Sequence, residues 1–155
     1  LLINRKIAAS LLGKLAPILL GKKVELRGDP AVCEIVPQAK PAKESDWEEE
    51  YLDLILAVRV VDSLDEAVEL INRYGSHHTD AILTKDYGNS MKFLTAVDSA
   101  CVFVNCSTRF ADGGEFGMGC EIGISTDKLH ARGPMALKEL TTAKFIALGG
   151  GQIKT

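Results

Sequence analysis

The strongest constraint on the fold is a regular alternation of strand-like and helix-like segments between residues 54 and 105. The first segment, LILAVRVV at 54–61, is a continuous apolar, β-branched run, which is typical of a strand buried on both faces. The segments that follow it are helix 63–74, strand 80–84, helix 88–97 and strand 100–105. Because helices of this length cross between parallel strands, the pattern predicts an α/β fold with a mostly parallel sheet and crossover helices.

The helix that follows the first strand carries its own start and stop signals. Ser63 and Glu66 have the spacing of a capping box, in which the hydroxyl and the carboxylate bind each other's backbone N–H. Gly75 is expected to end the helix in the left-handed conformation. The side chains expected to be buried are Leu64, Ala67, Val68, Ile71 and Tyr74.

An amphipathic helix is also expected at 5–20, with Pro17 kinking its last turn and Gly21 ending it. Its apolar stripe comprises Ile7, Leu11, Leu15 and Ile18, widened by Leu12 and Leu19. A short strand and turn follow at 23–29, and the polar, proline-containing segment 36–50 is expected to be an exposed connection. Near the other end we expect a helical turn at 134–140, a strand at 144–148 and a flexible tail.

Composition excludes several classes of protein. A chain of 155 residues is about one domain, and its net charge of -3 offers no basic footprint for nucleic acid. No apolar run reaches the ~20 residues that span a membrane. Four cysteines without a CxxC pair, and only three histidines, argue against zinc and favour reduced thiols in the cytoplasm.

The segment NCSTRFADGGEFGMGCEIG, 105–123, is the best candidate binding site. It begins at the carboxyl end of the third strand, and ligands of open α/β sheets bind beyond that end. Arg109, between Thr108 and Phe110, suits a carboxylate or phosphate; the alternative is a surface arginine paired with Asp112 or Glu115. The glycines at 113, 114, 117 and 119 permit close backbone approach to a ligand, but their spacing is not a nucleotide fingerprint.

For several other polar residues, two roles are possible. Glu50 is either an acceptor for a sugar's hydroxyl groups or a solvated acid in an acidic run. His77 and His78 suit a metal site or, better, a solvated turn. His130 and Arg132 either bind an anion or fix a loop. Cys106 lies beside the proposed pocket, but no histidine lies close in sequence to activate it, so we expect a structural thiol.

Three stretches resemble the gamma-glutamyl phosphate reductase family, also called glutamate-5-semialdehyde dehydrogenase, of the aldehyde dehydrogenase superfamily. They are YGSHHTDAILT, the long segment VDSACVFVNCSTRFADGGEFGMGCEIGISTDKLHARGP, and ELTTAKFIALGGGQIK. EEYLDLILAVRVVDSLDEAVELINRYGS fits the same family. The resemblance implies that residues 1–140 are the C-terminal part of a catalytic domain and that residues 141–155 are an oligomerisation flap strand and tail.

The resemblance also implies a reaction. Members of this family reduce gamma-glutamyl phosphate to glutamate 5-semialdehyde with NADPH, releasing phosphate, in proline biosynthesis. A cysteine thiolate attacks the acyl phosphate and forms a thioester, which a hydride then reduces. That cysteine is expected upstream of Leu1, so we expect this chain alone to be inactive. A homo-oligomer is expected, and glutamate 5-kinase is a further expected partner.

Some family roles fall on residues of this chain. Glu50 is similar in position to the glutamate that binds the nicotinamide ribose, with Glu49 as an adjacent alternative. The resemblance implies that the substrate site includes Asn105, Ser107, Thr108, Arg109, Gly113 and Gly114, with Arg109 on the substrate's α-carboxylate. Two alternatives stay open: the reductase half of a bifunctional pyrroline-5-carboxylate synthase, and a non-catalytic interaction domain of the same fold.

Overall fold

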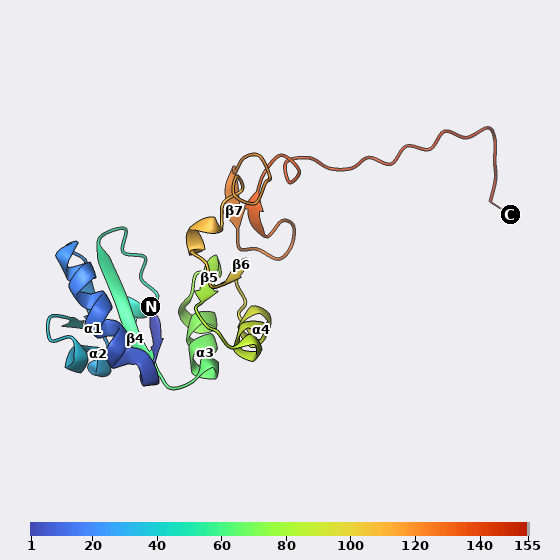
Figure 1. Cartoon of the computed structure of the whole chain (residues 1–155). Coiled ribbons are helices and arrows are strands. Elements are labelled where there is room, and N and C mark those ends of the chain that lie inside the picture. Colours follow the sequence, from blue (N-terminus) through green and yellow to red (C-terminus); the bar gives the residue numbers. More distant parts are fainter. Residues whose placement is uncertain (155) are drawn as a thin grey trace.

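The computed structural model describes residues 1–154, and residues 2–61 are built on a parallel four-stranded sheet (Figure 1). In spatial order the strands are β1 (Leu2–Asn4), β4 (Ile55–Val61), β2 (Glu25–Gly28) and β3 (Lys40–Pro41). Leu2 lies opposite Arg59 of β4, and all neighbouring pairs are parallel. The central strand β4 buries Val58 and Val60, as its continuous apolar run predicts.

Helix α1 (Arg5–Gly21) packs on this sheet through a different face from the expected one. Its buried residues are Ala8, Leu12 and Ala16, one turn apart. The predicted stripe is wrong in large part, because Ile7 is 51% exposed and Leu11 37%. Two alanines let the helix backbone approach the strands closely, and a search for large apolar side chains overlooks such an interface.

The ends of two helices also differ from expectation. Helix α1 ends at Gly21 as expected, but the left-handed residue beyond it is Lys23 (φ 62°). Helix α3 (Leu64–Tyr74) ends at Gly75 with a φ of -69°, so this glycine is not left-handed. Gly75 is needed for another reason: a Cβ there would lie 2.5 Å from the carbonyl oxygen of Ile71. The glycine is required by close packing rather than by its backbone angles.

Between β2 and β3 the chain forms a helix that the sequence pattern did not predict, α2 (Pro30–Ile35). Asp29 begins it: one carboxylate oxygen accepts from the N–H of Val32 at 2.8 Å, and the other accepts from the N–H of Val60 at 2.9 Å. Asp29 therefore joins the helix start to strand β4. Val32 is fully buried below it.

The connection 36–50 is not uniformly exposed, because it contains the buried carboxylate of Asp46. Asp46 lies in a short 3₁₀ helix, η1 (Glu44–Trp47). Its carboxylate accepts hydrogen bonds from the backbone N–H of Lys43 (2.6 Å), the guanidinium of Arg27 (2.6 Å) and the hydroxyl of Tyr51 (2.8 Å). These three donors hold the connection against the sheet.

The middle of the chain forms a second α/β unit. Helix α3 leads to β5 (Thr79–Ile82), helix α4 (Tyr87–Ala96) and β6 (Cys101–Val104), and the two strands pair in parallel. The Ser63 hydroxyl accepts from the N–H of Glu66, whereas the Glu66 carboxylate reaches Asp62 rather than Ser63, so half of the expected capping box forms. The predicted β-α-β-α-β order and parallel pairing are confirmed, but β4 is not hydrogen-bonded to β5 or β6.

The last part of the chain contains less regular structure. A 3₁₀ helix, η2 (Thr108–Phe110), is followed by an antiparallel pair, β7 (Gly123–Ser125) and β8 (Gly133–Met135). The predicted helical turn at 134–140 therefore begins as a strand, and a turn forms only at 137–140. Residues 141–154 extend away from the body, and the expected strand at 144–148 has no pairing there (Figure 1). Within residues 1–154, no helix has the length and apolar character needed to cross a membrane.

Candidate functional site

The candidate loop starts at Asn105, the first residue after β6. Its side-chain amide donates to the carbonyl of Thr84 at 2.7 Å and accepts from the N–H of Thr84 at 2.8 Å. Thr84 follows β5, so this pair joins the carboxyl ends of the two strands. Asn105 has a φ of 56°, in the left-handed region that asparagine tolerates better than most residues. The amide therefore sets the direction in which the loop leaves the sheet.

Arg109 projects from the short helix η2 with its guanidinium exposed. The Ser107 hydroxyl accepts from the backbone N–H of Arg109 at 3.2 Å and starts this helix. Asp112 instead accepts from the N–H groups of Gly114 and Glu115. Across residues 1–154 no salt bridge engages Arg109, so the alternative of an arginine paired within its own loop is not realised.

Gly113 is buried at the base of the loop. Its N–H donates to the carboxylate of Glu121 at 2.9 Å, and a Cβ would lie 2.2 Å from the carbonyl oxygen of Cys120. No other residue fits there without moving the backbone. Gly117 and Gly119 have positive φ values, so they turn the chain as expected. The glycines close the loop on itself and leave Arg109 on its outer side.

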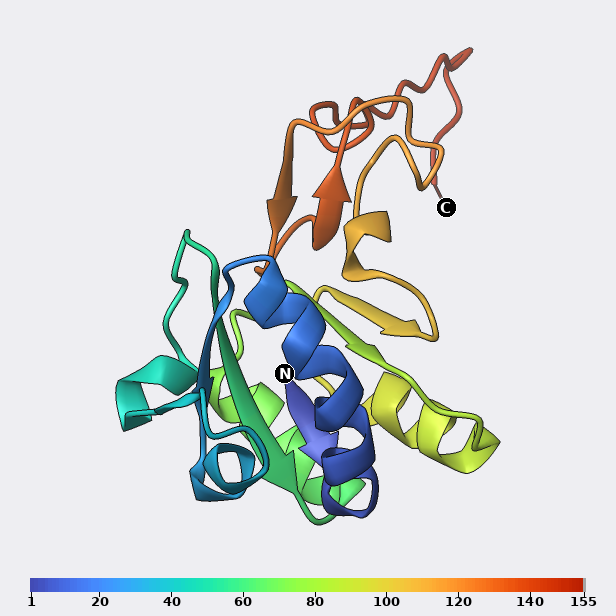
Figure 2. The ribbon, with the colours of Figure 1, turned by 60° about the vertical axis from the view of Figure 1, so that its left-hand side comes forward.

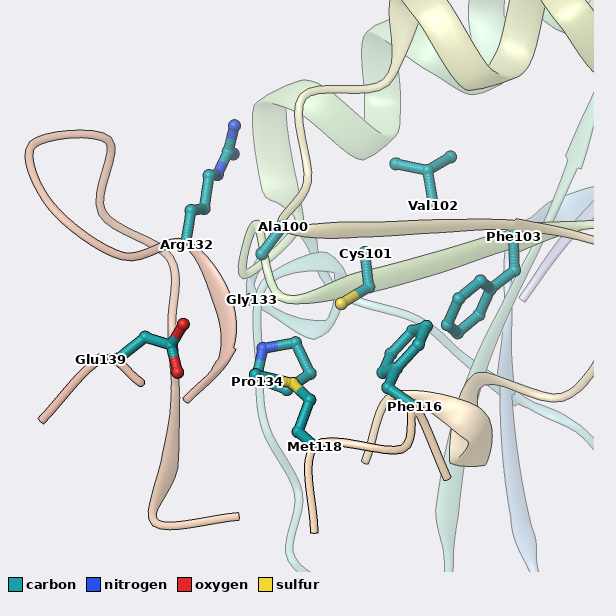
Figure 3. Close-up of a pocket in the computed structure, with 10 residues that line it drawn as sticks. All are labelled: Ala100, Cys101, Val102, Phe103, Phe116, Met118, Arg132, Gly133, Pro134 and Glu139. Carbon is teal, nitrogen blue, oxygen red and sulfur yellow. The ribbon is translucent and has the colours of Figure 1, made fainter. Parts of the chain in front are cut away.

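An apolar hollow of about 560 Å³ lies beside the loop (Figure 3). Figure 3 shows the rings of Phe103 and Phe116 side by side; their centroids are 6.1 Å apart and their planes are tilted by 39°. The thiol of Cys101 points into the hollow, where burial raises its pKa, so it is protonated at neutral pH. Met118 and Pro134 complete the apolar lining.

Arg132, at the rim of this hollow, fixes a loop. Its guanidinium donates to the carboxylate of Asp98 at 3.0 Å and to the backbone carbonyl of the same residue at 3.1 Å. Lys128 donates to the other carboxylate oxygen at 2.6 Å. These two cations, Lys128 first, lower the pKa of Asp98. Of the two readings of Arg132, the structure therefore supports the structural one.

His77 and His78 each contact a neighbouring polar group. A ring nitrogen of His77 lies 2.7 Å from the carbonyl oxygen of Asp98, and one of His78 lies 2.6 Å from the hydroxyl of Thr79. All four cysteines are free thiols. In the described part of the chain, no three His, Cys, Asp or Glu side chains gather as metal ligands.

Glu50 lies on the connection that leads into β4. Its side chain is exposed, so its carboxylate is accessible to a ligand's hydroxyl groups. Its neighbour Tyr51 is anchored: the hydroxyl binds Asp46, and the guanidinium of Arg27 lies 4.9 Å from its ring centre. Burial, followed by the Asp46 carboxylate, raises the pKa of Tyr51 to about 12. The spacing of residues in the acidic run of the sequence does not indicate this contact between Tyr51 and Asp46.

The structure thus gathers all the expected substrate residues in one loop after β6 and places Glu50 with the other sheet. Asn105 and Gly113 make structural contacts within that loop. The exposed polar groups that remain are those of Ser107, Thr108 and Arg109. This surface combines one free guanidinium with two hydroxyl groups, which suits a small anionic ligand.

Comparison with known proteins shows which family the chain resembles over its whole length. Gamma-glutamyl phosphate reductases of Clostridium botulinum (strain Eklund 17B) and Geobacter metallireducens are 56% and 57% identical to the chain over 154 residues. The crystal structure of gamma-glutamyl phosphate reductase from Thermotoga maritima matches 99% of the chain with a TM-score of 0.94 and 50% identity. In all three cases the chain spans 37% of the relative's length.

A family model confirms the wider relationship. The aldehyde dehydrogenase family model matches residues 16–146, which include both parallel sheets apart from β1, and the candidate loop. The chain belongs to the aldehyde dehydrogenase family.

Proposed function

We propose that the protein to which this chain belongs reduces gamma-glutamyl phosphate to glutamate 5-semialdehyde, with NADPH as the reductant and release of phosphate. This is the reductive step of proline biosynthesis. The observation that carries the proposal is the identity of 56–57% to gamma-glutamyl phosphate reductases over 99% of this chain. The candidate loop lies inside that match and presents a cation to an anionic substrate.

In this proposal the candidate loop binds the glutamyl end of the substrate. Arg109 forms a bidentate pair with the α-carboxylate, since its planar guanidinium matches a carboxylate and has no competing acid. Ser107 and Thr108 donate hydroxyl hydrogen bonds beside it. Asn105 acts by fixing the loop through Thr84. Gly113 and Gly114 let the backbone pass close to the ligand.

The proposed cofactor contact in this chain is Glu50, whose exposed carboxylate accepts hydrogen bonds from the nicotinamide ribose of NADPH. The Tyr51–Asp46 hydrogen bond holds the adjacent backbone in place. When bound, NADPH supplies the hydride that reduces the acyl carbon. A carboxylate on an anchored connection is chemically suited to a ribose, which offers two hydroxyl donors.

The nucleophilic cysteine is proposed to come from outside this chain, because the cysteines present have other surroundings. The Cys33 thiol donates to the Gly28 carbonyl at 3.4 Å, inside the first sheet. Cys101 has a raised pKa, the opposite of what a thiolate nucleophile needs. Cys106 and Cys120 lie on the candidate loop. The exposed cation of that loop, Arg109, is assigned to the substrate's carboxylate.

We further propose that residues 1–140 belong to the catalytic domain and that residues 141–155 act as an oligomerisation strand and tail. Phe145, Ile146 and Leu148 are exposed apolar residues on the extended segment. The backbone of an extended segment of this kind gains hydrogen-bond partners by pairing with a strand of a second subunit. The intact protein is accordingly expected to be a cytoplasmic homo-oligomer with reduced cysteines.

The proposal is tested by assaying the intact protein with gamma-glutamyl phosphate generated in place by glutamate 5-kinase and ATP. NADPH oxidation should depend on the kinase. One inorganic phosphate should be released for each NADPH oxidised, beyond that from a control without NADPH. Oxidation of NADPH that proceeds equally without the kinase would contradict the proposal.

A further inference from the structure

The connection that carries Glu50 has few contacts of its own. Figure 2 shows it as a long loop that leads from η1 to the start of β4. Within residues 1–154 the backbone of residues 49–52 makes no hydrogen bond, and no salt bridge includes Glu50. Leu52, two residues further on, is 89% exposed. A carboxylate on such a loop needs an anchor nearby if it is to stay in one place.

Tyr51 is that anchor, because its hydroxyl reaches back to the 3₁₀ helix. The hydroxyl donates to the carboxylate of Asp46 at 2.8 Å and lies 3.2 Å from the carbonyl oxygen of the same residue. Asp46 is 5% exposed, so little water competes for its carboxylate. Burial first, and then this carboxylate, raises the pKa of Tyr51 to about 12. The hydroxyl is therefore protonated near neutral pH and remains a donor.

Arg27 on β2 ties this anchor to the sheet. Its guanidinium donates to the carboxylate of Asp46 at 2.6 Å and to that of Glu25 at 2.8 Å. The same guanidinium lies 4.9 Å from the centre of the Tyr51 ring, within the range of a cation–π contact. Tyr51 is thus held at two points: Asp46 binds its hydroxyl, and a residue of the sheet contacts its ring.

The backbone just beyond the anchor is strained. Leu52 has a φ of 49°, an unfavourable conformation because its Cβ crowds the following carbonyl oxygen. Two residues later the carbonyl of Leu54 accepts from the N–H of Glu25 at 2.8 Å, which fixes the start of β4. Strained residues persist where the contacts on both sides leave them no other path. With Tyr51 fixed on one side and Leu54 on the other, the path of the loop beside Glu50 is set.

We propose that Tyr51, supported by Arg27, is a positioning residue for the cofactor: it holds the Glu50 carboxylate where the ribose hydroxyl groups of NADPH reach it. The inference rests on the proposed function, in which Glu50 binds that ribose. Tyr51 itself does not contact the cofactor. It acts because an anchored loop has less conformational freedom to lose when the ligand binds. Loss of the Tyr51 hydroxyl therefore weakens NADPH binding through Glu50.

The test is a direct titration of the intact protein with NADPH, followed by the fluorescence of the bound nicotinamide. Tyr51→Phe removes the hydroxyl, keeps the ring against Arg27, and should raise the Kd for NADPH roughly threefold, as expected for one lost hydrogen bond. Glu50→Ala, which removes the acceptor, should raise the Kd at least as much. The double variant should have the Kd of Glu50→Ala alone, because Tyr51 acts only through Glu50. Effects that multiply in the double variant would overturn the proposal.

Tyr74→Phe is the matched control. The Tyr74 hydroxyl binds the carboxylate of Glu44, in the same 3₁₀ helix as Asp46, but Tyr74 lies on α3. This variant also loses one hydroxyl–carboxylate hydrogen bond to η1, so its melting temperature should be similar to that of Tyr51→Phe. Its Kd for NADPH should equal that of the parent. An equal rise in Kd for both phenylalanine variants would show a general loosening of η1 and would contradict the proposal.

The outcomes separate this inference from the proposed function. An unchanged Kd for Tyr51→Phe, together with a raised Kd for Glu50→Ala, would overturn the inference alone. An unchanged Kd for Glu50→Ala would remove Glu50 from the cofactor site, and the inference would fail with it. Because NADPH binding is measured directly, each outcome can be read whichever substrate the intact enzyme reduces.

Discussion

The side-chain amide of Asn105 binds both backbone groups of Thr84, at 2.7 and 2.8 Å, and so ties together the carboxyl ends of β5 and β6. Asn105→Ala removes both hydrogen bonds and leaves a left-handed residue without asparagine's tolerance for it. We expect a loss of about 2 kcal/mol in the free energy of unfolding. Thermal unfolding of the intact protein measures this loss. Asn105→Gly, which relieves only the backbone strain, should fall between the alanine variant and the parent; equal stability of all three would contradict the role.

Arg109 has a free guanidinium on the outer side of the candidate loop. In the intact enzyme Arg109→Ala should raise the KM for the glutamyl substrate roughly 10- to 100-fold, the range expected when a hydrogen bond to a charged group is lost. Its melting temperature should stay close to that of the parent, because no salt bridge within residues 1–154 is lost. Arg109→Lys should restore only part of the affinity, since lysine lacks the bidentate fork. An unchanged KM for Arg109→Ala would remove Arg109 from the substrate site.

Glu50 and Glu49 form a matched pair of neighbouring, exposed acids. Glu50→Gln should raise the KM for NADPH severalfold and leave the KM for the glutamyl substrate unchanged, because a neutral amide is a weaker acceptor for ribose hydroxyls. Glu49→Gln should change neither value. Steady-state kinetics with each substrate varied in turn separates the two. A larger effect of Glu49→Gln would move the ribose contact to that residue.

Asp46 makes the stability of the first sheet depend on pH. The Lys43 N–H, then Arg27 and Tyr51, lower its pKa to about 2 from an ordinary value of 3.8. A lowered carboxyl pKa stabilises the fold fully above about pH 4, and this stabilisation is lost as the pH falls toward 2. Melting temperatures of the parent and of Asp46→Asn should therefore differ most near pH 6 and converge between pH 4 and 2. A difference that stays constant over this range would show that the charge of Asp46 contributes nothing.

Much of the fold follows from local sequence patterns. The apolar run of β4 and the capping signal at Ser63 mark elements that form where expected. What the patterns missed depends on contacts between distant segments. Asp29 starts α2 but also binds Val60, and Asp46 is buried only because Arg27, 19 residues away, meets it. Neither partner has a fixed spacing that a periodicity could reveal.

The face of α1 is a second example of the same limit. The helical period correctly predicts the helix, but Ala8 and Ala16 face the sheet while Ile7 and Leu11 are exposed. The candidate loop follows a strand of a parallel sheet, as the pattern predicts, and its role in binding stays a prediction. The sequence did not predict the structural contacts of Asn105 and Gly113 within this loop. Asn105 binds Thr84 and Gly113 packs against Cys120, and these pairs come close only in the folded chain.

The most direct test of the proposed function is the reverse reaction of the intact protein. Glutamate 5-semialdehyde and NADP⁺ should yield NADPH only when inorganic phosphate is present, at a rate that saturates with phosphate. Phosphate is required because it releases the acyl group from the enzyme as gamma-glutamyl phosphate. Formation of NADPH at the same rate without phosphate would show an ordinary aldehyde oxidation and contradict the assignment to acyl-phosphate reduction.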